Sequence, residues 1–193
     1  SNVIVTGPAG SDTLTKVEKL TFTDKSVVLV GHAASNLTTV QSGIDAASAG
    51  DVVLVASGSY AENITISKSL TVLGPNADIS PNSGTRVSEA VLVPASTNTS
   101  TGAVVTITTS NVVFRGFTVD GDNPALASSG VGLGGALGTS IDAARTIFIN
   151  ANGITGVTVE KNIAKNAVNG IRLEQTTNYF ASGAVAVRSY GIV

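Results

Sequence analysis

The fold is decided by residues 38–74, which read TTVQSGIDAASAGDVVLVASGSYAENITISKSLTVLG. Three short runs in this stretch carry apolar residues two positions apart: Val53 and Val55, Ile64 and Ile66, and Leu70 and Val72. Residues two apart on a strand point to the same face of the sheet. Each run therefore predicts a short strand with one buried face.

Apolar pairs of this kind recur along the chain with a period near 40 residues. One set has steps of 38, 40 and 40 residues: Val53 and Val55, Val91 and Val93, Val131 and Leu133, Ile171 and Leu173. A second set has steps of 41, 42 and 38: Ile64 and Ile66, Val105 and Ile107, Ile147 and Ile149, Val185 and Val187. A third has steps of 42 and 45: Leu70 and Val72, Val112 and Phe114, Val157 and Val159. Strand triplets that repeat together indicate a solenoid, in which each strand pairs in parallel with its counterpart one coil later, about 4.8 Å away.

This pattern predicts an all-β fold, a single-stranded parallel β-helix of three to four coils over residues 51–193. An antiparallel β-sandwich also has short strands and is the alternative, but it does not require triplets to recur. Long loops flank the strands of the first set, so a binding groove is expected over that set.

Two elements are expected before the solenoid. Residues 37–49 predict a helix that caps the first coil, with Val40, Ile44 and Ala47 on one face. Residues 16–30 predict a β-hairpin around a TDKS turn. The chain is therefore divided into an N-terminal strand and hairpin segment, residues 1–35, and a capping helix plus parallel β-helix, residues 36–193.

The sequence stops inside an apolar strand of the fourth coil, and no capping segment follows it. Solenoids need caps at both ends. We expect either a longer, truncated parent chain or self-association through the open C-terminal coil.

Composition excludes several classes of function. The 193 residues are 42% hydrophobic and 12% charged, with a net charge of −2. No basic stripe is present, so nucleic acid is not expected as a partner. No apolar run approaches the ~18 residues of a membrane span, and the lack of cysteine excludes a disulfide framework and a thiolate metal site.

The expected groove offers little chemistry. The outward positions of the first set are Leu54, Leu92, Gly132 and Arg172. None is a carboxylate, whereas acid–base catalysis needs paired titratable groups, so no catalytic residue is assigned. Arg172 is the candidate contact for an acidic sugar, with a solvated outward arginine as the alternative. The single histidine, His32, is expected to be a solvated linker residue.

One acidic cluster is a candidate metal site. Asp120, Asp122 and Asn123 present oxygens in the spacing that calcium ligands can have. A Gly-Asp-Asn turn after a strand explains the same residues through turn chemistry alone. Calcium is thus the one cofactor for which the sequence offers ligands.

Residues 38–74 resemble the opening of right-handed parallel β-helix proteins of the pectin-lyase-like superfamily. The resemblance lies in a capping helix followed by Gly50, Asp51, Gly58, Tyr60, Glu62, Lys68 and Gly74. Residues 156–175, GVTVEKNIAKNAVNGIRLEQ, are similar to the generic repeat of such folds, with Asn162 at the bend. The signatures of pectin methylesterases and polygalacturonases are missing. The resemblance implies a right-handed β-helix and leaves its activity open, because this fold hosts many functions.

Residues 11–30 resemble segments that follow or separate calcium-binding RTX repeats in secreted bacterial proteins, although the repeats themselves are missing. This implies an extracellular or cell-surface location. We expect a noncatalytic module for adhesion, carbohydrate contact or assembly, with a polysaccharide or cell-surface glycan as partner. The alternative is the N-terminal part of a polysaccharide lyase, esterase or hydrolase whose catalytic coils lie beyond residue 193.

Overall fold

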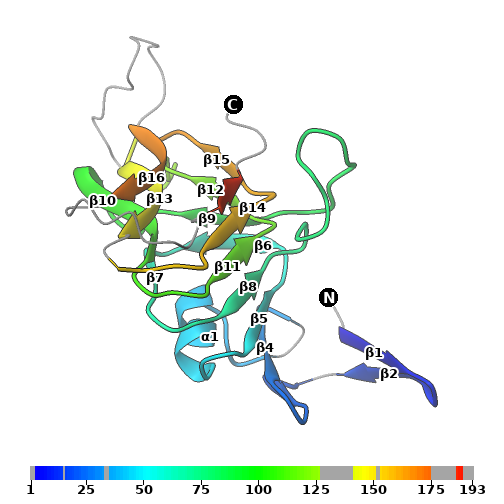
Figure 1. The fold of residues 1–193 in the computed structure, drawn as a ribbon. Coiled ribbons are helices and arrows are strands. Elements are labelled where there is room, and N and C mark those ends of the chain that lie inside the picture. The colour runs from blue at the N-terminus through cyan, green and yellow to red at the C-terminus, as the bar shows by residue number, and fades with distance from the viewer. Residues whose placement is uncertain are drawn as a thin grey trace.

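Strands dominate the computed structural model, which describes residues 3–14, 16–32, 35–126, 141–150, 153–174 and 186–188 (Figure 1). These residues form the strands β1 to β17 and one short helix, α1. The all-β class predicted from the sequence is confirmed. None of the helical structure in these ranges is long and apolar enough to cross a membrane.

The largest sheet has seven strands in the order β17-β14-β11-β8-β5-β4-β3. Its members are β3 (Lys19–Thr21), β4 (Ser26–Val30), β5 (Val52–Val55), β8 (Thr71–Leu73), β11 (Val113–Arg115), β14 (Thr158–Glu160) and β17 (Ala186–Arg188). Among the described strands of this sheet, only β3 and β4 pair antiparallel, which confirms the predicted hairpin. Because β4 also pairs in parallel with β5, the hairpin extends this sheet across the boundary placed at residue 36.

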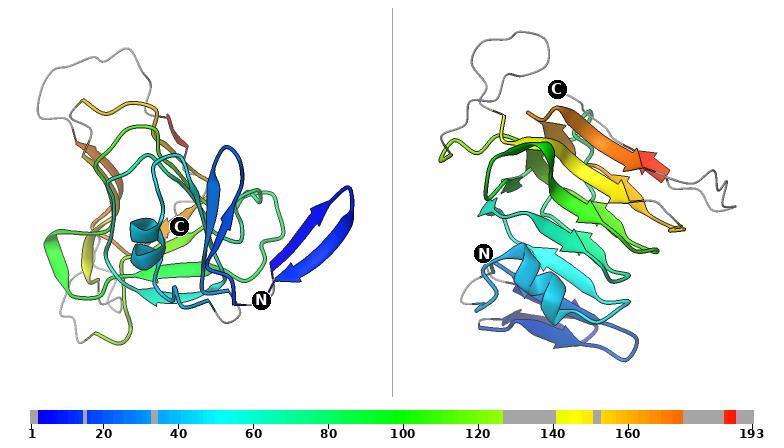
Figure 2. Two further views of the ribbon diagram at one scale, coloured as in Figure 1. Left: turned by 90° about the horizontal axis from the view of Figure 1, so that it is seen from below. Right: turned by 90° about the vertical axis from the view of Figure 1, so that its left-hand side faces the viewer.

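Two further sheets have four parallel strands each. One contains β6 (Gly58–Ala61), β9 (Ala90–Val93), β12 (Thr118–Asp120) and β15 (Ile163–Lys165). The other contains β7 (Ile64–Ile66), β10 (Asn98–Ile107), β13 (Ala143–Asn150) and β16 (Asn169–Glu174). From β5 onward the chain visits the three sheets in a fixed order and then returns to the first. We call three successive strands such as β5–β6–β7 a layer, and Figure 2 shows the layers stacked on one another.

The space between the three sheets is filled by aliphatic rows. Fully or nearly fully buried side chains in register include Val53, Val72, Phe114 and Val159 on one sheet and Ile64, Val105 and Ile147 on another. The rings of Phe114 and Phe117 stack with centroids 4.5 Å apart. Each large buried side chain stabilises the fold by about 1.5–3 kcal/mol, so this core needs no disulfide.

The predicted strand sets are correct in part. The second set is confirmed for Ile64, Val105 and Ile147, and the third for Val72, Phe114 and Val159. The fourth member of the second set is wrong, because Ile147 pairs with Ile171, whereas Val187 pairs with Val159.

The first set does not exist as a column. Val53 pairs with Val72, Val91 pairs with Thr118 in another sheet, and Ile171 lies in the third sheet. Val131 and Gly132 lie outside the described residues. Leu92, expected to point outward, is fully buried. Every column shares the same approximate period, so spacing alone does not assign a strand to a column.

Helix α1 (Val40–Ala46) lies across one end of the core, within the predicted range but shorter (Figure 2). Thr39 caps it by accepting a hydrogen bond from the Ser42 N–H at 3.2 Å. The Glu62 carboxylate accepts the N–H groups of Val40 and Gln41, satisfying donors that every helix start leaves open. Val40 and Ile44 are buried against the core. The helix therefore shields the core where the first layer would otherwise be open.

Strands β1 (Val3–Gly7) and β2 (Gly10–Leu14) form a separate antiparallel hairpin. It projects away from the three sheets (Figure 1). Apart from Val5 and Leu14, the side chains described from Ile4 to Leu14 are exposed. The hairpin thus contributes little to the core.

Candidate functional site

Arg172 lies on β16 and faces outward from the sheet β7–β10–β13–β16. It is the last member of a row in which Thr65, Thr106, Phe148 and Arg172 are in register. The predicted groove residues are not brought together, because Leu54 lies in the seven-stranded sheet and Leu92 is buried in the remaining one. The neighbours of Arg172 therefore come from β13 instead of the predicted first set.

A second arginine lies beside this row. The guanidinium carbon of Arg145 is 4.5 Å from the centroid of the Phe148 ring, a cation–π contact. Its Nη1 donates to the Thr101 carbonyl at 2.9 Å, and its Nε is buried and has no hydrogen-bond partner among the described residues. We call Arg145, Phe148 and Arg172 the arginine face. It combines two cations and one aromatic ring on one side of a sheet.

Arg145 was not among the predicted site residues. Regular strand alternation would put Arg145 and Phe148 on opposite faces of β13. Arg145 and Phe148 are three positions apart, yet both are half-buried on the outer side. Thr146 between them is buried, and its hydroxyl donates to the Gly170 carbonyl at 2.6 Å. The regular period of two holds only from Ile147 to Ile149 in this strand. An aromatic residue three positions after an arginine was the only signal available in the sequence.

The predicted calcium ligands lie at the corner that follows β12. Asp120 forms an ion pair with Lys165 at 2.9 Å and accepts the Asn166 side-chain amide at 2.9 Å. The Asn123 side chain donates to the Pro94 carbonyl and accepts the Ala125 N–H, as in a turn. Protein groups thus engage Asp120 and Asn123, and calcium binding stays a prediction.

The structure adds Asp142 to this corner, a residue for which the sequence holds no local signal. Asp142 is fully buried and accepts the Thr97 hydroxyl at 2.6 Å and the Asn123 N–H at 2.9 Å. Burial, then the charges of Asp120 and Asp142, raise the pKa of Asp122, while Lys165 opposes this shift. Across the described ranges, no three His, Cys, Asp or Glu side chains are placed to hold a metal ion together.

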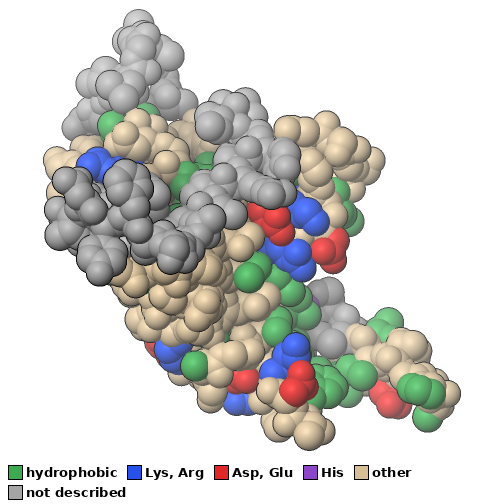
Figure 3. Space-filling view, in the orientation of Figure 1, with side chains coloured by type: hydrophobic (Ala, Val, Ile, Leu, Met, Phe, Trp, Pro, Cys, Tyr) green, Lys and Arg blue, Asp and Glu red, His purple; other side chains and the backbone are tan. Residues whose placement is uncertain are grey.

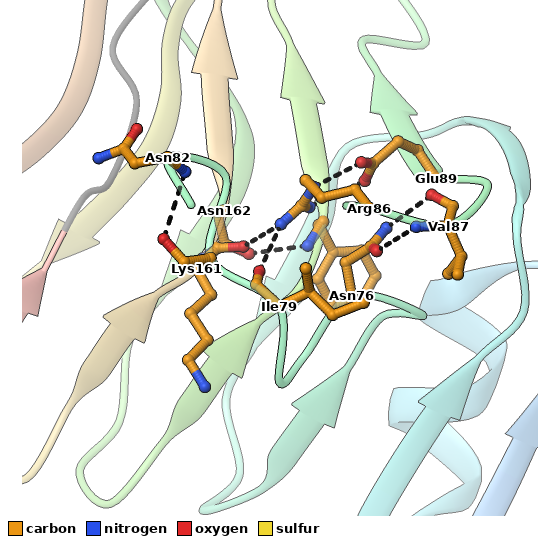
Figure 4. Close-up of polar contacts among 10 residues, drawn as sticks. Asn76, Ile79, Asn82, Arg86, Val87, Glu89, Lys161 and Asn162 are labelled. Atoms are coloured by element: carbon orange, nitrogen blue, oxygen red, sulfur yellow. Dashed lines mark hydrogen bonds and ion pairs between the residues drawn. The ribbon is translucent and has the colours of Figure 1, made fainter. Parts of the chain in front are cut away.

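The long connection between β8 and β9 is fixed by polar contacts (Figure 4). Arg86 forms a bidentate pair with Glu89, at 2.6 and 2.9 Å, and donates Nη1 to the carbonyls of Ile79 and Lys161. Nearby, Asn162 lies at the bend between β14 and β15, as the sequence resemblance placed it. Charged side chains of both signs gather on one face of the molecule (Figure 3). Arg115 also forms ion pairs, with Asp78 at 3.5 Å and Glu160 at 3.4 Å. These contacts hold a corner in place and leave no cation free for a ligand among those named.

His32 is not a solvated linker residue, so that expectation is wrong. It is half-buried, and its ring nitrogens are shielded from solvent. It lines a pocket of about 350 Å³ together with Leu54, Val55, Ala56, Ser57, Pro75, Val87 and Ser88. Most of these residues are apolar, and the pocket lies where β5 ends and β6 begins.

No family model, curated protein or solved structure matches this chain. The resemblance to pectin-lyase-like proteins and to RTX-associated segments therefore stays a prediction.

Proposed function

We propose that this chain is a right-handed parallel β-helix that serves as a noncatalytic, carbohydrate-binding module of a secreted or cell-surface bacterial protein. The fixed order in which the chain visits three parallel sheets supports the solenoid. The arginine face supports the binding role and is the observation that carries it. Adhesion to a glycan surface is the biological use that fits both.

The chemistry of the arginine face selects an acidic polysaccharide. Guanidinium groups bind carboxylates through paired, charge-assisted hydrogen bonds. Arg145 and Arg172 lie on neighbouring strands, but Arg145 is in register with Asn169, so the two arginines are offset by about 10 Å along the strands. Successive acidic groups of one extended polymer can contact both. Phe148 holds Arg145 in place through the cation–π contact. A polymer of uronic acid residues is therefore the proposed ligand class.

The test is binding of the whole chain to polygalacturonate, compared with a neutral polysaccharide, by calorimetry and affinity electrophoresis. We expect binding to the acidic polymer only, weakening as salt is added. Arg172→Ala and Arg145→Ala should each weaken binding about tenfold or more, since a hydrogen bond to a charged group contributes about 1.5–3 kcal/mol. Equal binding to the neutral polymer, or no binding to either, would contradict the proposal.

A matched control comes from the β3–β4 turn. Lys25 is exposed there and forms an ion pair with the exposed Asp24 at 3.6 Å. Lys25→Ala removes one positive charge, as Arg172→Ala does, and should leave binding within experimental error. Arg172→Lys keeps the charge but loses the planar fork, so we expect it to bind more weakly than the parent.

The enzyme alternative has one observation in its favour. The pKa of Asp122 is raised, first by burial and then by the charges of Asp120 and Asp142, and a raised pKa is what the general acid of a glycoside hydrolase needs. Slow turnover of the polymer, lost in Asp122→Asn with folding intact, would favour this alternative. Binding without turnover would favour the noncatalytic module.

A further inference from the structure

The first layer has three strand edges that face away from the second layer, and two of them are covered. The edge of β5 is paired with β4. The edge of β7 is covered by a side chain, since Gln41 accepts the Thr65 N–H at 2.8 Å and donates to the Thr65 carbonyl at 3.4 Å. The Gln41 amide thus takes the place of a neighbouring strand. Covered edges do not recruit other chains.

The edge of β6 differs from these two. The N–H groups of Gly58 and Glu62 donate to carbonyls of the next layer, so the backbone N–H and C=O groups of Gly58, Tyr60 and Glu62 point toward β9. Ser59 and Ala61 alternate with them, and their backbone groups face away from β9. Within the described residues, β6 pairs with β9 alone. Ser59 and Ala61 are exposed, and no described residue bonds to their backbone groups on this side, so we take this edge as the place for an incoming strand.

The pocket beside His32 adjoins this open edge. Ala56 and Ser57, which line it, lead directly into β6 at Gly58. Val87, on its rim, is 56% exposed although it is a large apolar residue. A strand added to β6 would therefore find an apolar cavity at one end of the pairing, with room for an aliphatic side chain.

The same chain carries a strand with matching properties. The β1–β2 hairpin stands alone, and an isolated two-stranded sheet is at best marginally stable in water. Ile4 on β1 is 62% exposed, more than Phe22 or Val87, and Figure 3 shows hydrophobic side chains on the projecting hairpin. The edge of β1 that faces away from β2 has no described partner. Both features favour docking onto another surface.

We propose that the open edge of β6 accepts β1 from a second copy of this chain, with Ile4 entering the pocket beside His32. Strand pairing to Ser59 and Ala61 supplies backbone hydrogen bonds, and the pocket selects the apolar residue. Donor and acceptor lie on different parts of each copy, so the contact is head-to-tail and can continue from copy to copy. This contact uses the α1 end of the stack and is independent of the proposed glycan binding.

The test changes the inserted strand β1 (the donor) and the receiving edge of β6 (the acceptor) separately in the whole chain. Association is measured by sedimentation velocity over a concentration series. Ile4→Lys changes the residue of β1 that enters the pocket. Ala61→Pro removes the Ala61 N–H from the receiving edge of β6; no described residue bonds to this N–H, so the fold should tolerate the substitution. We expect the parent chain to associate, and each variant to do so with a dissociation constant raised about tenfold or more. Phe22→Lys, which changes another exposed apolar residue, and Ala61→Thr, which keeps the N–H, should associate like the parent.

Mixing the two defective variants gives the decisive result. Ile4→Lys retains an intact acceptor, and Ala61→Pro retains an intact donor, so together they should form a one-to-one complex that does not grow further. Circular dichroism and thermal unfolding verify that both variants are folded. A parent chain that stays monomeric, association that survives both substitutions, or a mixture that forms no complex would overturn the proposal.

Discussion

Asn162 shows how one side chain can fasten two layers together. It is 2% exposed, its Oδ1 accepts the Phe117 N–H at 3.0 Å, and its Nδ2 donates to the Phe114 carbonyl at 3.0 Å. Phe117 lies at the bend one layer earlier and Phe114 in strand β11 just before it, 45 and 48 residues away in sequence. The amide thus satisfies a donor and an acceptor that water cannot reach.

Replacing this amide should weaken the fold measurably. Asn162→Ala leaves the buried Phe117 N–H without its acceptor and removes one donor to the Phe114 carbonyl. An unpaired buried group costs about 1–3 kcal/mol of unfolding free energy. Denaturant titration measures the loss. Asn82→Ala is the control, because Asn82 is exposed on the β8–β9 connection and makes one bond, from its backbone N–H to Ser80. Equal stability of the two variants would contradict the role given to Asn162.

The sequence predicts the place of a residue only where its immediate neighbours in the chain form a recognisable pattern. Asn162 was foreseen because it follows a strand and precedes a second one in a recognisable repeat. Asp142 was not, because its partners Thr97 and Asn123 become neighbours only when layers stack. At the bend before Asn162, Lys161 has φ 56°, where the previous layer has Gly116 at φ 86°. No sequence rule places a lysine in that left-handed region.

Helix α1 determines how the first layer is closed. Ile44 is 1% exposed and packs with Val40 against the core. Ile44→Asp should cost several kcal/mol of unfolding free energy, because a buried, unpaired carboxylate is strongly unfavourable. Ala46→Asp adds the same charge at an exposed position of this helix and should cost less than about 1 kcal/mol. Comparable melting temperatures for both variants would show that α1 does not shield the core.

Asp51 joins the elements on either side of that helix. It is buried and accepts the N–H groups of Ser48 and Ser26, at 2.9 and 2.8 Å, with Lys19 3.4 Å away. The hydrogen bond from Ser48 does most to lower the pKa of Asp51; burial opposes the shift, and Ser26 and Lys19 assist it. A lowered pKa means that the ionised carboxylate stabilises the fold above the ordinary value of about 3.9.

The consequence is a stability difference that depends on pH. Asp51→Asn should lose about 1–3 kcal/mol near neutral pH. The gap to the parent should narrow as pH falls below about 3.9 and through the lowered pKa, because the parent then loses its carboxylate as well. Urea titrations at several pH values measure this, with the exposed Asp24→Asn as control. A gap that is constant with pH would refute the assigned role.

The elements were predicted unevenly, for a physical reason. The hairpin, the helix and two strand columns followed from turn residues, an apolar helical face and recurring β-branched pairs. The first column failed because β9 reads Ala-Val-Leu-Val, and a run that is apolar throughout does not reveal which face is buried. Its Leu92 points inward and Val91 is only half-buried.

At the scale of the whole molecule, the corner of Asp120, Asp122 and Asp142 joins several layers. Its partners come from the connections after β9 and β12, from the last residue of β15 and from Asn166 just beyond it. Stacking thus concentrates negative charge that the sequence spreads over many residues. The pKa of Asp122 is raised first by burial and then by the nearby charges of Asp120 and Asp142.

This corner should make the fold more stable when Asp122 is protonated. Because its folded-state pKa is raised, the stabilisation is complete below about 3.9 and is lost as pH rises through the raised value. Asp122→Asn should therefore melt at a higher temperature than the parent near neutral pH and at a similar temperature in acid. Asp78→Asn, at an 85% exposed side chain, should follow the parent throughout. A variant that melts lower at neutral pH would contradict this prediction.

The connections between layers differ widely in length, whereas the strands stay in register. Asn169 reaches Ala144 in the preceding layer across 25 residues of chain, and Glu160 reaches Arg115 across 45. Insertions and deletions at the corners therefore leave the stacked strands unchanged, and lengthening a loop costs little free energy. A foreign peptide can therefore be spliced into the exposed residues 82–85 while Arg86 and Asn76 still hold the base of that loop.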